Sequence, residues 1–114
     1  MKRIFTSILF CLMSLFMQAQ KEFHVTIFGT HQGNGSMSQP WDLQTALSQK
    51  PSVINGGDTV WIHEGVYQGR FVSTLKSTLQ TKNVTVAPYK DHKVVLDGNV
   101  SSDRSSVLEV MGNN

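Results

Sequence analysis

Cysteine is almost absent from the sequence, since Cys11 is the only one among 114 residues. It lies within residues 1–19, where two basic residues precede an apolar run at residues 4–16 and Ala19 offers a small residue for cleavage. This pattern is typical of a secretory signal peptide. Removal of the signal peptide leaves residues 20–114, a chain of 95 residues without cysteine. A chain without cysteine can form no disulfide, and it has no thiol nucleophile and no thiolate ligand for a metal.

An excess of charge of one sign is also lacking. Ten Lys and Arg outnumber eight Asp and Glu only because Lys2 and Arg3 stand in the leader, so residues 20–114 carry eight of each and no net charge. A neutral chain does not offer the basic surface that nucleic acid or an anionic membrane requires. We therefore expect no nucleic-acid partner.

Long apolar runs are missing after the leader. A membrane-spanning helix needs roughly 20 apolar residues, and no segment of residues 20–114 is of that kind. The sequence thus predicts an exported protein, secreted or periplasmic, with no membrane span in its mature chain. Its length suffices for one small domain with a modest core.

Strand-forming residues are abundant, and they recur at a fixed interval. Residues 20–114 hold twelve Val and eight Thr but six Leu, and β-branched side chains suit a pleated sheet. Triplets of apolar–any–apolar type stand at residues 60–62, 84–86 and 108–110, and a second track links residues 71–72 to residues 95–96. Both tracks have a period of 24. A short period without helices between the strands predicts an all-β solenoid, a parallel β-helix with about 24 residues per coil.

A small sandwich of antiparallel hairpins is the main alternative for such a β-rich chain. It would require tight Asn-Gly or Asp-Gly turns between adjacent strands. The dipeptides Asn34-Gly35 and Asp97-Gly98 exist, but neither links two matched alternating runs. The solenoid is therefore favoured.

Residues 20–58 differ from the repeat and predict a cap. Residues 23–28 alternate apolar and polar side chains as one strand, and a Gly-rich and Ser-rich loop follows. Residues 40–49 predict a short helix that starts at a proline and ends before Pro51. A solenoid needs its open end covered, so we assign residues 20–58 to an N-terminal cap and residues 59–114 to the first coils. The apolar face of the helix would consist of Leu43, Ala46 and Leu47.

The order of these motifs resembles a known superfamily. Residues 56–62 read GGDTVWI, residues 65–71 read GVYQGRF, residues 84–89 read VTVAPY and residues 94–98 read VVLDG. This is similar to the N-terminal end of secreted bacterial right-handed parallel β-helix proteins of the pectate-lyase-like superfamily. Polysaccharide lyases of the alginate lyase and chondroitinase B type belong to it. The resemblance covers residues 23–110 and implies the fold and a polysaccharide partner.

The resemblance also implies that further coils follow in the relatives, which carry their catalytic residues there and in some cases calcium. Here the sequence stops after the third triplet, so we expect a truncated β-helix whose open last coil self-associates. Two functions fit this expectation. One is the N-terminal cap and first coils of a lyase or glycosidase, and the other is a non-catalytic secreted or cell-surface β-helix that binds glycans or serves as a scaffold.

Three residues are candidates for contact with carbohydrate. Trp61, Thr85 and Glu109 are the middle members of the triplets, and the middle side chain of such a strand points outward. A period of 24 would place them in one outward ladder, where the indole could stack on the apolar face of a sugar ring. The alternative is that Trp61 is covered by the N-terminal strand or by the helix that follows Trp41.

No residue pattern marks a catalytic group. Asp58 and Asp97 adjoin glycines, where a carboxylate ordinarily stabilises a turn. The histidines at positions 24, 31, 63 and 92 lack the paired spacing of metal ligands. A lyase relative would use Lys or Arg beside a uronate, yet no motif marks Arg70 or Lys93. We therefore assign no catalytic residue, no metal ligand and no cofactor to this chain.

Overall fold

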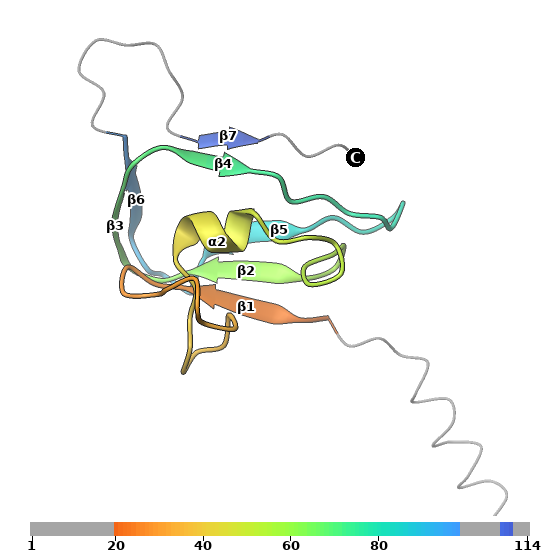
Figure 1. Cartoon of the computed structure of the whole chain (residues 1–114), viewed down its shortest axis with the longest axis horizontal. Coiled ribbons are helices and arrows are strands. Elements are labelled where there is room, and N and C mark those ends of the chain that lie inside the picture. The colour runs from red at the N-terminus through yellow and green to blue at the C-terminus, as the bar shows by residue number, and fades with distance from the viewer. Residues whose placement is uncertain (1–19, 99–107, 111–114) are drawn as a thin grey trace, which may run out of the picture.

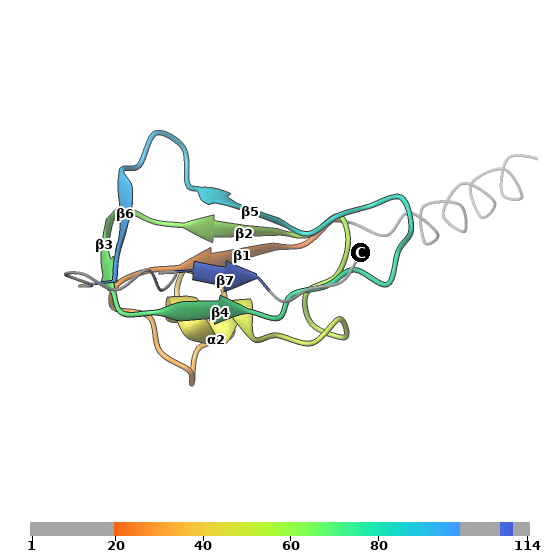
Figure 2. The ribbon, with the colours of Figure 1, turned by 90° about the horizontal axis from the view of Figure 1, so that it is seen from above.

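The computed structural model describes residues 20–98 and 108–110, so the predicted signal peptide at residues 1–19 lies outside the described residues. Strands dominate, with one short helix, and they form three parallel sheets (Figure 1). The first sheet has the order β1 (Glu22–Val25), β2 (Thr59–Ile62) and β5 (Thr85–Pro88). Figure 2 shows these three strands side by side.

Two smaller sheets complete the arrangement. Strand β3 (Gly65–Gln68) pairs with β6 (Val94–Asp97), and β4 (Phe71–Ser73) pairs with β7 (Leu108–Val110). Along the chain, β2, β3 and β4 are followed by β5, β6 and β7, and each strand pairs with the one three places before it. All pairs of named strands in the described residues are parallel. The all-β class is confirmed, and an antiparallel sandwich does not fit this pairing.

The constant period of 24 residues is wrong. Strands β2 and β5 pair at a separation of 26 residues, with Thr59 opposite Thr85, while β3 and β6 pair at 29 and β4 and β7 at 37. The loops between the strands differ in length, and this gives the unequal separations. Parallel pairing fixes which residues are opposite and which face each side chain occupies, but it does not fix the length of the connecting loop. Residues 108–110 therefore pair with β4 instead of β5, and residues 95–96 lie beside β3 instead of β4.

The first strand is shorter than predicted. It ends at Val25 instead of residue 28, and Trp41 forms a bridge beside Val25 through two backbone hydrogen bonds. One runs from the Trp41 amide to the His24 carbonyl at 3.1 Å, the other from the Thr26 amide to the Trp41 carbonyl at 3.2 Å. Gly29 follows, and a Cβ there would lie 2.0 Å from the Trp41 carbonyl oxygen. Only glycine therefore fits at position 29, where the backbone passes this close to Trp41.

The helix is also shorter than predicted. Helix α2 spans Leu43–Leu47 instead of residues 40–49, because Trp41 is extended and Asp42 is the N-cap. The Asp42 carboxylate accepts a hydrogen bond from the Thr45 amide at 3.1 Å, which satisfies one of the free amides of the first turn. The predicted buried face is confirmed, since it consists of Leu43, Ala46 and Leu47.

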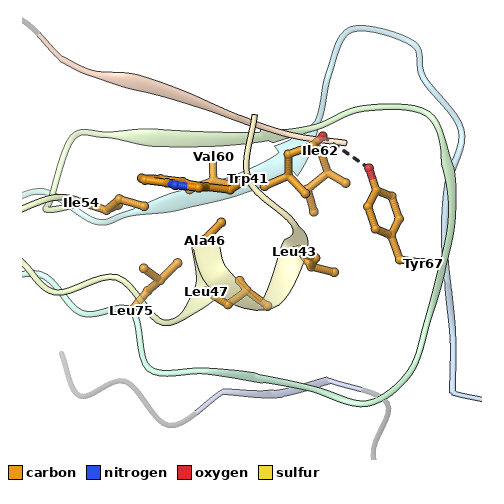
Figure 3. Packing of buried hydrophobic residues seen from close by; sticks show 10 residues of the cluster. Trp41, Leu43, Ala46, Leu47, Ile54, Val60, Ile62, Tyr67 and Leu75 are labelled. Carbon is orange, nitrogen blue, oxygen red and sulfur yellow. Dashed lines mark hydrogen bonds between the residues drawn. The ribbon is translucent and has the colours of Figure 1, made fainter. Parts of the chain in front are cut away.

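The core lies between the three sheets. Figure 3 shows α2 between β2 and the segment of β4, with Tyr67 of β3 at one side. Val25, Ile54 and Val60 are fully buried against this helix. The Tyr67 hydroxyl donates to the His63 carbonyl at 2.8 Å and lies 3.3 Å from the Val25 carbonyl. Its burial raises the pKa of Tyr67 to about 12, so the phenol stays protonated as a donor.

Within the part of the chain that the structure describes, no helix has the length and apolar character needed to cross a membrane.

Candidate functional site

The predicted ladder of Trp61, Thr85 and Glu109 does not form. Trp61 lies beside Ala87, while Thr85 lies beside Thr59, because the strands pair at 26 residues and not 24. Glu109 belongs to another sheet, where it is opposite Val72. The three candidates are therefore distributed over two sheets and do not share one surface row. Trp61 and Thr85 still lie on the same sheet, two positions apart in register.

Trp61 is half-buried and lies between two strands. On one side its partner is His24 of β1, and on the other it is Ala87 of β5. Trp41, which precedes helix α2, does not cover Trp61. Its ring is buried in the core, where it stacks on Phe23 with a centroid distance of 5.3 Å. Trp41 also donates its indole N–H to the Gly33 carbonyl at 2.6 Å. Trp61 thus remains on the outer face of the first sheet.

A hollow of about 570 Å³ opens beside the Trp61 ring. We call it the Trp61 hollow. Tyr89 forms one wall, with its ring centroid 6.0 Å from that of Trp61 and the two planes at 71°. Strand β1 and the segment after β5 supply most of the remaining lining. The hollow is lined by Glu22, His24, Met37, Trp61, Pro88, Tyr89 and Lys90.

Three histidines lie close together at this hollow, which one of them lines, and we call them the histidine cluster: His24, His63 and His92. The Nδ1 atom of His24 lies 2.8 Å from Nε2 of His63. The His63 ring stacks on Tyr89 at 4.3 Å with an interplanar angle of 25°, and His92 lies 5.5 Å from His63. The Glu64 amide donates to Nδ1 of His92 at 3.2 Å. The cluster joins β1, the corner after β2 and the turn after β5.

Burial favours the neutral imidazoles in this cluster. Desolvation lowers the pKa of His24, and the Glu22 carboxylate opposes this shift. Desolvation also lowers the pKa of His63, and repulsion from His24 and His92 lowers it further. The His24–His63 hydrogen bond needs at least one neutral ring, since one of its two nitrogens must be unprotonated to accept. The neutral form of both rings is therefore favoured.

Sequence reasoning missed the histidine cluster. It treated the histidines one at a time and sought metal-ligand spacing along the chain. His24 and His63 are 39 residues apart, and only the register of β1 with β2 brings them together. The available signal was that His24 lies in the first strand and His63 directly follows the second. In the described residues, no group of three or more His, Cys, Asp or Glu side chains is arranged to hold a metal ion.

Asp58 has the turn role that the sequence predicts. Its carboxylate accepts hydrogen bonds from the Lys21 amide at 3.0 Å and the Asn55 amide at 2.9 Å. The Lys21 ammonium lies 3.7 Å from the same carboxylate. Asp58 is buried, so these contacts replace the water that an isolated carboxylate would need. This carboxylate stabilises the start of β2.

Comparison with known proteins gives one informative likeness. No protein-family model matches the chain, and no curated protein matches it. Among solved structures the chain is similar to XylC in its complex with xylose, at 29% sequence identity over 64% of this chain, with a TM-score of 0.53. The matched part spans 11% of the XylC chain. The likeness supports a β-helix-like superfamily, and the pectate-lyase-like assignment stays a prediction.

Proposed function

We propose that this chain is the N-terminal capping segment and first coils of an exported right-handed parallel β-helix protein that acts on polysaccharides. Its catalytic residues would lie on further coils. One observation carries the proposal: β5, β6 and β7 pair in parallel with β2, β3 and β4 in the same order. A chain that returns to stack strand on strand in this way follows the geometry of a parallel solenoid.

The position of α2 supports the capping role. The helix packs between the first sheet and β4, and its three apolar side chains are buried there (Figure 3). Strand β1 covers the edge of β2 that lies away from β5. Without these elements the first coil would expose apolar side chains and an unpaired edge.

The second turn of strands supports the existence of further coils. Val86 pairs with Val60 and shares its inward face, yet Val60 is 0% exposed and Val86 is 41% exposed. Leu108 pairs with Phe71 in the same way and is 39% exposed. Leu96 is opposite the buried Tyr67 and is itself only partly buried. We call Val86, Leu96 and Leu108 the open layer. A following coil would bury these side chains as the second turn buries those of the first.

The polysaccharide part rests on two observations. The similar protein XylC is described with xylose, and Trp61 stands on the outer face beside a hollow. Of the three sequence candidates, Trp61 is the best placed to contact a sugar, and Thr85 is an exposed neighbour on the same sheet. Glu109 lies on the third sheet, in register with Val72. Export through residues 1–19 to the medium or periplasm completes the proposal.

A second candidate function is a non-catalytic β-helix that binds glycans or serves as a scaffold. The Trp61 hollow favours it, because an aromatic hollow on the outer face is a binding feature and needs no catalytic group nearby. In this case the described coils would themselves carry the function.

The test uses the natively exported product. Its intact mass is measured first, and then its ability to depolymerise a panel of neutral and acidic polysaccharides is assayed by released reducing ends and by absorbance of unsaturated uronates. We expect a mass well above the 12.7 kDa of this chain and cleavage of at least one polysaccharide. A product of the short chain's mass that retains glycans without cleaving them would favour the second function. A product that neither cleaves nor retains any glycan would contradict action on polysaccharides and glycan binding alike, and of the two functions would leave only the scaffold.

A further inference from the structure

The Trp61 hollow has a flat aromatic floor on the outer face of the first sheet. Trp61 lies in register with Ala87, whose side chain is a single methyl group. Space therefore remains beside the indole, and the ring is only half-buried. The apolar C–H face of a pyranose ring matches such a surface in size and polarity.

The wall of the hollow is fixed before any ligand arrives. The Tyr89 ring stacks on His63 at 4.3 Å, and the Lys90 ammonium lies 5.1 Å from the Tyr89 centroid. These two contacts hold Tyr89 at 71° to Trp61. A ring lying on Trp61 would thus have its edge against Tyr89. Because the corner exists in the free protein, binding would cost little ordering of side chains.

One ring nitrogen of His24 has no hydrogen-bond partner among the described residues. His24 lines the hollow and is 8% exposed, and its Nδ1 is engaged by His63. Among the described residues no group hydrogen-bonds its Nε2. A buried polar nitrogen without a partner is costly. A hydroxyl group would suit it in either tautomer, since a hydroxyl both donates and accepts while Nε2 does one or the other.

From these three features we infer that the Trp61 hollow binds one neutral pyranose unit of a polysaccharide. The sugar stacks on Trp61 and places a hydroxyl on Nε2 of His24. The lining includes one carboxylate, Glu22, and one ammonium, Lys90, so it offers no surplus positive charge for a uronate. Its volume of about 570 Å³ lies within the range of small-molecule sites. This inference rests on the proposed function, whose polysaccharide it narrows to a neutral one.

The experiment titrates the exported form of the full chain with xylohexaose and, separately, with a galacturonate hexamer. Binding is followed by calorimetry and by the ¹⁵N shifts of the His24 ring. We expect saturable binding of xylohexaose, a weaker response to the acidic oligomer, and a shift at Nε2 of His24. Trp61→Ala should weaken binding about tenfold, which corresponds to the upper range for aromatic stacking. His24→Phe should weaken it severalfold through loss of the hydrogen bond.

Matched controls lie outside the hollow. Phe28→Ala removes another exposed aromatic ring, 86% exposed, and His31→Phe removes an exposed histidine. Neither should change the affinity. Circular dichroism establishes that each variant is folded, and the His24 ring shifts in the unmodified protein test the contact even if His24→Phe does not fold.

Several outcomes would overturn the inference. These are the absence of saturable xylohexaose binding at millimolar concentration, equal binding by Trp61→Ala, an unmoved His24 ring, or tighter binding of the galacturonate. The proposed function is judged separately by depolymerisation. If the product cleaves polysaccharide but gives one of these results, the proposed function stands and the sugar site at the Trp61 hollow is rejected.

Discussion

Gly35 allows the loop after β1 to fold against the Phe23–Trp41 stack. It has φ of 81°, and a Cβ there would lie 2.8 Å from Cδ1 of Phe23 and 2.8 Å from Cζ3 of Trp41. Its carbonyl also accepts the His24 amide at 2.7 Å. The residue therefore combines a backbone conformation that favours glycine with a contact too close for any side chain.

Gly35→Ala is expected to destabilise the fold by about 2–4 kcal/mol, the combined cost of left-handed backbone and overpacking. The measurement is the free energy of unfolding in urea. Gly57→Ala is the matched control, because Gly57 has φ of 90° but a Cβ there meets only two flexible side chains, that of Lys82 at 3.4 Å and that of Gln20 at 3.7 Å. It should cost about 1 kcal/mol from backbone strain alone. Equal losses in both variants would show that the contact with Phe23 and Trp41 contributes nothing.

At the scale of elements, the sequence predicted the structure within one segment better than it predicted which segments pair. The apolar spacing of residues 43–47 sufficed to identify the buried face of α2, because a helix repeats locally. The length of α2 was overestimated, since the extended backbone of Trp41 depends on its bridge to Val25. The strand register depends on loop lengths, and no local pattern encodes those. The His24–His63 contact follows from that register, so the candidate site stayed hidden while Trp61 was found.

The histidine cluster connects the three neighbouring strands of the first sheet, β1, β2 and β5, and it predicts acid sensitivity. The pKa values of His24 and His63 are lowered in the fold, so the unfolded chain binds more protons below the ordinary value of about 6.5. Their contribution to stability is complete above that pH and is lost as the pH falls from there through the lowered pKa values of the folded state. The titratable groups that face the pair are Glu22 on β1, which raises the pKa of His24, and Tyr89 and His92 after β5, of which His92 lowers the pKa of His63. Only Glu22 opposes the effect.

We therefore expect the urea midpoint to fall between pH 7.5 and pH 5.5. His63→Phe should flatten this dependence, because the phenyl ring keeps the stack on Tyr89 and removes the titrating group. His31→Phe, at an exposed loop position, should leave the dependence unchanged. A midpoint that is constant over this range, or that rises towards pH 5.5, would contradict the assignment of neutral histidines.

At the scale of the whole molecule, the two ends of the described fold differ. One end is closed by β1 and α2, and the other presents the open layer of Val86, Leu96 and Leu108. In the part of the chain that the structure describes, β5 also has no strand on its far edge. Apolar side chains beside an unpaired edge form a surface that another strand-bearing surface can cover. We propose that this end makes the isolated chain self-associate.

Val86→Lys is expected to suppress this self-association, because a buried ammonium in the contact would be strongly unfavourable. Sedimentation of residues 20–114, expressed alone, over a hundredfold range of concentration measures it. Val66→Lys is the matched control: Val66 is also exposed, at 52%, but it adjoins Tyr67 on β3 and so points to the opposite face of its strand. It should leave association unchanged, since the same charge is added away from the open layer. A chain that stays monomeric at every concentration, or a Val66 variant that dissociates as readily as the Val86 variant, would show that the open layer is not the contact.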